Sequence, residues 1–121
     1  MLFRSSEHPF LAGLTEICGG DDEFAHELAL SFLESAPSLL TAIDSALQAG
    51  DPKALGAGAH ALSGISRTIG AGKLAVSSGK LEEFSRQGDL AAAAPEAARL
   101  ESAWEELRIA LEGFLVAEIK A

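Results

Sequence analysis

The sequence predicts an all-α protein, an antiparallel four-helix bundle with a short additional N-terminal helix. Apolar residues recur every three or four positions along most of the chain, which is the spacing of amphipathic helices, and no stretch alternates as a strand does. Hydrophobic residues make up 48% of the sequence, which has many alanines and no tyrosine, a composition that suits a helical bundle. Because 121 residues suffice for one core and not for two, we expect a single domain over residues 1–121.

The first 20 residues are expected to hold a short helix that caps the bundle. This helix should run from Pro9 to Cys18, because proline suits a first helical position and Gly19-Gly20 then ends it. One side of it carries Phe10, Leu14 and Ile17. The bundle itself is expected over residues 21–118.

The first long helix begins at an aspartate cap, Asp21 or Asp22, and keeps the helical rhythm of apolar residues as far as Leu47. Pro37 lies inside this run, where it removes one backbone hydrogen bond. Because the periodicity continues in phase across the proline, we expect one kinked helix rather than two separate ones.

Two short breaks delimit the next pair of helices. Gly50-Asp51-Pro52 combines a helix stop, a cap and a first-position proline, and the helix that it starts should end near Ile69. Gly70-Ala71-Gly72 leads into a return helix over residues 73–87. So short a connection makes these two helices antiparallel neighbours.

The last helix follows Gly88-Asp89. From Leu90 to Phe114 the apolar residues are spaced alternately three and four apart, which is the heptad seam of a bundle helix. Pro95 indicates that the regular part of this helix begins near Ala94, with a looser turn before it.

His60 stands out within the helix over residues 52–69. On a helical wheel, the apolar residues of this helix lie roughly 140° to 220° away from His60, so the imidazole should face water. The face around His60 is expected to carry small groups with a cation at either end: Lys53, Gly56, Ala57, Ser63, Gly64 and Arg67. A glycine inside a helix costs about 1 kcal/mol relative to alanine. Because glycines are retained at this cost, the small side chains around His60 favour a surface that another protein approaches closely.

A set of residues at fixed spacing around His60 resembles the signature of the histidine-containing phosphotransfer (HPt) domain of bacterial multistep phosphorelays. Ser63 departs from that signature, since the family usually has a lysine there. The matching residues are His60, Leu62, Gly64, Ser66, Ile69, Gly70, Ala71, Leu74, Leu81 and Glu82.

The resemblance implies that His60 accepts a phosphoryl group from a receiver-domain aspartate of a hybrid sensor kinase and passes it to a downstream response regulator. It implies no cofactor of the chain's own, with magnesium on the partner receiver, and no kinase activity. We expect the receiver to dock over Gly56, Ala57, Ser63 and Gly64. Arg67 leans back toward His60, and it is either a replacement for the missing lysine or a solvated surface charge.

Composition excludes several other functions. A formal net charge of -9 argues against binding to nucleic acid or to anionic membranes. The lone Cys18 cannot form an internal disulfide, which is consistent with a reducing compartment, and we expect it to be a core residue. The sequence shows no signal-peptide run and no membrane span. We therefore expect a cytoplasmic monomer.

Two alternatives remain open at this stage. The first is an HPt-like interaction module that binds receiver domains without phosphotransfer, which Ser63 alone supports. The second is a metal-dependent bundle hydrolase. Glu23 and His26 have a ligand-like spacing, but no second such pair exists, so we expect no metal site. His8 and His26 are expected to be ordinary surface residues.

Overall fold

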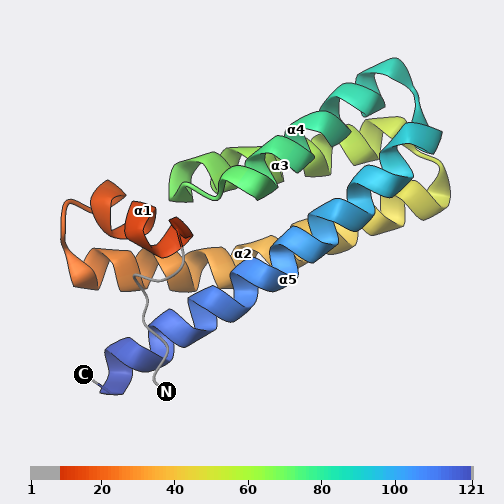
Figure 1. Ribbon diagram of the computed structural model, residues 1–121. Coiled ribbons are helices and arrows are strands. Elements are labelled where there is room, and N and C mark those ends of the chain that lie inside the picture. The colour runs from red at the N-terminus through yellow and green to blue at the C-terminus, as the bar shows by residue number, and fades with distance from the viewer. Residues whose placement is uncertain (1–8, 121) are drawn as a thin grey trace.

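The computed structural model describes residues 9–120, and all five helices within that range agree with the predicted fold class. Helices α2 to α5 pack as an antiparallel four-helix bundle (Figure 1). The short helix α1 lies at one end of this bundle, against α2 and α5. In order, the helices are α1 Pro9–Ile17, α2 Asp22–Ala49, α3 Pro52–Ile69, α4 Gly72–Gln87 and α5 Leu90–Lys120.

Local signals in the sequence set the helix boundaries. The side chain of each aspartate that precedes α2, α3 or α5 accepts a hydrogen bond, 3.0 or 3.1 Å long, from the backbone N–H three residues on. These aspartates are Asp21, Asp51 and Asp89. At the other ends, three glycines adopt φ between 67° and 78°, a left-handed conformation that strains other residues. They are Gly50, Gly70 and Gly88.

Both internal prolines lie within continuous helices. The helix α2 passes through Pro37 as one helix, as predicted, and the kink at Pro37 stays a prediction. For α5 the prediction was wrong, because the helix begins at Leu90 and not near Ala94. The Asp89 cap fixes the first turn, and the alanines that follow favour helix strongly enough to offset the single hydrogen bond that Pro95 removes.

The helix α1 closes the end of the bundle, where α2 and α5 extend beyond the turn between α3 and α4 (Figure 1). Phe10 and Leu14 are buried, and Leu11 is buried with them. Ile17, which the sequence places on the same side as Phe10 and Leu14, is 49% exposed. Cys18 lies in the core as predicted, and burial raises the pKa of its thiol.

Aliphatic side chains from every helix fill the core. Phe32 of α2 and Trp104 of α5 add an aromatic pair with ring centroids 5.8 Å apart. The helix α3 buries most of its apolar face: Leu55, Leu62 and Ile69 are at most 1% exposed, and Ile65 is partly buried. Burial of each such side chain contributes about 1.5–3 kcal/mol, so α3 is held firmly with its opposite face outward. Among the described helices, none is both long enough and apolar enough to cross a membrane.

Candidate functional site

His60 lies on the outer surface of α3 beside α4. Its side chain is 70% exposed, and its Nδ1 atom lies 2.8 Å from Oε2 of Glu82 on α4. A carboxylate can only accept a hydrogen bond, so this contact assigns the proton of a neutral imidazole to Nδ1. The Nε2 atom then carries a lone pair on a ring that is open to solvent. This is the arrangement that a nucleophilic imidazole needs.

Glu82 is itself held in place. Its side chain is only 23% exposed, and Nη1 of Arg86, one turn further along α4, lies 3.5 Å from the same Oε2 atom. Arg86 also forms an ion pair with Glu83, and the hydrogen bond and charge of Glu83 raise the pKa of the guanidinium. The carboxylate that orients His60 is therefore positioned by an arginine.

Three of the predicted site residues lie on the exposed face of α3 with His60, namely Ala57, Gly64 and Arg67. A Cβ atom added at Gly64 would meet no atom within 4 Å. No packing contact with the described part of the chain therefore requires a glycine at that position. Arg67 forms no ion pair with any side chain that the structure describes.

Two predicted site residues lie elsewhere, and their expected place on the open face was wrong. A Cβ atom at Gly56 would come 2.5 Å from Oγ of Ser85, so this glycine lets α3 and α4 approach closely. Ser63 is 0% exposed, and its Oγ has no hydrogen-bond partner among the described residues. Ala59 and Ser66 of α3 are buried as well. The centre of the buried face of α3 therefore lies about 50° further round the helix, toward α4, than the centre of the apolar stripe seen in the sequence.

Sequence reasoning missed three features of the site. Glu82 was recognised as part of the signature, but its contact with His60 was not predicted, and Arg86 was not considered. The sequence indicates this contact only weakly. The i, i+4 spacing of Glu82 and Arg86 permits an ion pair between them, but only the register of α3 against α4 brings the pair to His60. Gly79 on α4 also has no atom within 4 Å of an added Cβ. It lies nearly level with Gly64 across the hairpin, so the low relief beside His60 extends onto α4.

Within residues 9–120, His26 and the acidic residues form no comparable site. His26 is half-buried on α2, and His8 lies outside the described residues. Among the residues that the structure describes, no group of three or more histidine, cysteine, aspartate or glutamate side chains could hold a metal ion.

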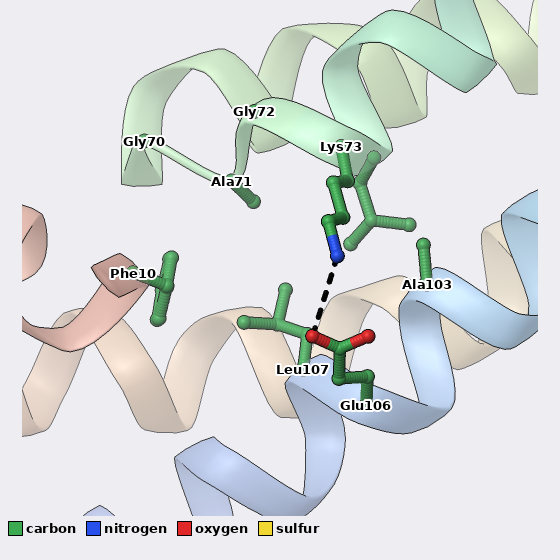
Figure 2. Close-up of a pocket in the computed structure, with 9 residues that line it drawn as sticks. Phe10, Gly70, Ala71, Gly72, Lys73, Ala103, Glu106 and Leu107 are labelled. Carbon is green, nitrogen blue, oxygen red and sulfur yellow. Dashed lines mark hydrogen bonds and ion pairs between the residues drawn. The ribbon is translucent and has the colours of Figure 1, made fainter. Parts of the chain in front are cut away.

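A separate cleft lies at the end of the molecule where α1 meets the turn between α3 and α4. Its volume is about 380 Å³, and apolar side chains such as Phe10, Leu74 and Leu107 line it. At its mouth Lys73 points toward Glu106 of α5, with Nζ 3.4 Å from Oε1 (Figure 2). The cleft begins at Gly70, ten residues and so about 15 Å along the helix from His60. It is therefore not part of the site around the imidazole.

Comparison with models of protein families identifies the family of this chain. The family model of the Hpt domain matches residues 27–110, which is more than half of the chain. The chain belongs to the Hpt domain family. Hpt domains are helical phosphocarrier modules of two-component phosphorelays, in which they interact with receiver domains. Comparison with curated proteins and with solved structures gave no significant match.

The Hpt match covers all of α3 and α4 and most of α2 and α5, whereas α1 lies outside it. The helices that surround His60 are thus the shared Hpt bundle. The helix α1 lies at one end of that bundle (Figure 1). The cleft beside it is lined by Phe10 of α1 together with residues of the shared bundle such as Leu74 and Leu107.

Proposed function

We propose that this Hpt domain is a phosphorelay intermediate that carries a phosphoryl group on Nε2 of His60. The donor is an aspartyl phosphate on the receiver domain of a hybrid sensor kinase, and the acceptor is the aspartate of a downstream response regulator. The observation that carries the proposal is the hydrogen bond from Nδ1 of a 70% exposed His60 to Glu82. It leaves Nε2 as the reactive atom on an accessible ring.

Transfer to His60 exchanges one bond to phosphorus for another. The Nε2 lone pair attacks phosphorus, the bond from phosphorus to the aspartyl oxygen breaks, and the donor aspartate leaves as a carboxylate. The imidazole keeps its proton on Nδ1, so the ring becomes positively charged. Glu82 lies against that proton and stabilises the charge. Transfer onward is the reverse reaction with a second receiver.

The surroundings of His60 fit a role in which the partner supplies most of the transfer machinery. Ala57 and Gly64 leave space for a partner to approach the ring. We propose that Arg67 leans toward the phosphoryl oxygens and partly replaces the cation that Ser63 does not provide. The domain then needs no cofactor and has no kinase activity of its own, and the magnesium ion sits on the receiver domain.

We further propose that the whole bundle acts as one transfer module, a monomer in the cytoplasm of a bacterium. The single buried cysteine suits a reducing compartment. The overall charge of -9 disfavours partners such as nucleic acid and anionic membrane.

Mixing the protein with a phosphorylated receiver domain tests the proposal. Wild-type protein is expected to acquire phosphate that is labile in acid and stable in base, and His60→Gln should acquire none while keeping its melting temperature. The matched control is His26→Gln, which should be labelled like the wild type. Labelling that survives in His60→Gln would refute the proposal.

The alternative function is receiver binding without phosphotransfer. Ser63 favours it, because a buried serine provides no cation where the family usually has a lysine. In that case a phosphorylated receiver would bind both wild-type protein and His60→Gln with equal affinity and would label neither.

A further inference from the structure

Charge is distributed very unevenly over this molecule. The hairpin of α3 and α4, residues 52–87, has five lysines and arginines against two glutamates and thus a net charge of +3. The whole chain carries -9, so the rest of it carries -12. The helix α3 has no acidic residue, whereas α2 has five acidic residues and neither lysine nor arginine.

Two free cations flank His60 on α3. Lys53 lies seven residues before His60 and Arg67 seven residues after it, so each is about 10 Å away along the helix axis and within about 20° of the direction of His60. Both side chains are exposed, and neither pairs with any side chain that the structure describes. The carboxylate of Glu82, which lies beside this face, is already engaged by His60 and Arg86. The positive charge on this face is therefore available to a partner.

The two arginines of α5 are different, because each of them forms an ion pair. On α5, Arg99 pairs with Glu96, and Arg108 pairs with both Glu105 and Glu112. A negatively charged partner would thus be repelled by most of the surface and attracted by the face that carries His60. An electric field of this kind raises the rate at which a charged partner meets the protein and favours the orientation in which the partner faces His60.

We infer that the exposed face of α3 is an electrostatic docking surface for an acidic protein surface, and that Lys53 and Arg67 orient this partner about His60. The inference rests on the proposed function and adds the chemistry of the partner. The receiver should present carboxylates on both sides of its phosphorylated aspartate, about 10 Å from it. Because helical side chains lean toward the N-terminus, Arg67 can also reach the phosphoryl group, whereas Lys53 leans away from it. Lys53 is therefore the residue that tests docking alone.

The first test is the dependence of transfer on salt. A panel of receiver domains, phosphorylated with a small-molecule acyl phosphate, is mixed with the wild-type protein at low and at physiological ionic strength. We expect kcat/KM for transfer to His60 to fall about tenfold between the two conditions, because the Debye length falls below the 10 Å that separate His60 from each cation. Receivers with more acidic residues around the aspartate should show the larger fall.

The second test compares two variants with the same change of net charge. Lys53→Gln removes one positive charge from the docking face, and Ser45→Glu adds one negative charge on the exposed side of α2. Lys53→Gln is expected to lower kcat/KM severalfold at low salt, with kcat unchanged, and to match the wild type at high salt. Ser45→Glu should change kcat/KM less than twofold. Phosphorylation of His60 by phosphoramidate, a small donor, should be the same in all three proteins.

The outcomes separate this inference from the function on which it rests. Transfer that is insensitive to salt, or equally affected by the two variants, overturns the docking surface and leaves phosphotransfer intact. If no receiver labels the wild-type protein at any ionic strength, the proposed function fails, and this inference fails with it.

Discussion

The two halves of the bundle differ in what their outer surfaces carry. The long helices α2 and α5 have acidic surfaces, and the arginines of α5 that lie within the described side chains are ion-paired. The shorter hairpin of α3 and α4 is basic and carries His60, and an added Cβ atom at its Gly64 or Gly79 would meet none of the described atoms within 4 Å. The fold could be built from either kind of surface. The difference supports the proposal that a partner docks on the hairpin, with α2 and α5 as its scaffold.

Within α3 the same division separates two glycines only six residues apart. A Cβ atom at Gly58 would lie 3.1 Å from Cγ1 of Ile43, whereas one at Gly64 would meet nothing within 4 Å. Gly58 is a packing residue between α2 and α3. Gly64 faces the space that a partner would occupy. Substitution by the same residue at the two positions tests this division.

The largest effect is expected from Gly58→Gln. The new side chain has no space beside Ile43, and overpacking of this kind costs up to about 3 kcal/mol of the free energy of unfolding. Chemical denaturation measures that change. Wild-type stability in Gly58→Gln would show that α2 and α3 are not packed as described.

Gly64→Gln should have the opposite pattern. Glutamine has the higher helix propensity, so the free energy of unfolding should stay level or rise by up to about 1 kcal/mol. Transfer from a phosphorylated receiver should nevertheless slow about tenfold, equivalent to about 1.4 kcal/mol, because the side chain obstructs the approach to His60. Stopped-flow or quench-flow transfer kinetics provide the measurement. Unchanged transfer together with lowered stability would make Gly64 a packing residue.

Glu82→Ala should produce a smaller loss. Without the carboxylate, Nδ1 of His60 loses its acceptor and the ring loses its fixed orientation. A hydrogen bond worth about 1 kcal/mol corresponds to a transfer rate about fivefold lower. Glu82→Gln retains an acceptor oxygen and should recover part of the loss. If both variants transfer at the wild-type rate, the contact does not assist the reaction.

The smallest effect is expected at Ser63. Its buried Oγ has no partner among the described residues, so Ser63→Ala removes a polar group that folding leaves unsatisfied. The free energy of unfolding should rise by up to about 1 kcal/mol, measured by denaturation. A clear loss of stability would mean that the hydroxyl has a partner in solution.

Local chemistry explains why much of this fold could be predicted from the sequence. An aspartate cap or a left-handed glycine determines a helix end without reference to the rest of the molecule, as at Asp51 and Gly70. The exposure of His60 also followed from the apolar stripe on the opposite side of α3. The start of α5 was misjudged because the effect of Pro95 was given more weight than the cap at Asp89.

The details around His60 could not be predicted, because they depend on how α3 packs against α4. Alanine and serine give no hydropathy signal, so the burial of Ala59 and Ser63 was invisible in the stripe. Glu82 is 22 residues from His60, and only the register of the two helices brings them together. Sequence periodicity determines which face of a helix is apolar, but it does not determine which neighbour covers its edges.

The nitrogen that carries phosphorus tests the central claim most directly. Protein labelled with ¹⁵N is phosphorylated by a receiver domain, and NMR coupling between phosphorus and the imidazole nitrogens identifies the bonded atom. We predict phosphorus on Nε2 of His60, with the proton retained on Nδ1 facing Glu82. Phosphorus on Nδ1, or on any other residue, would contradict this account.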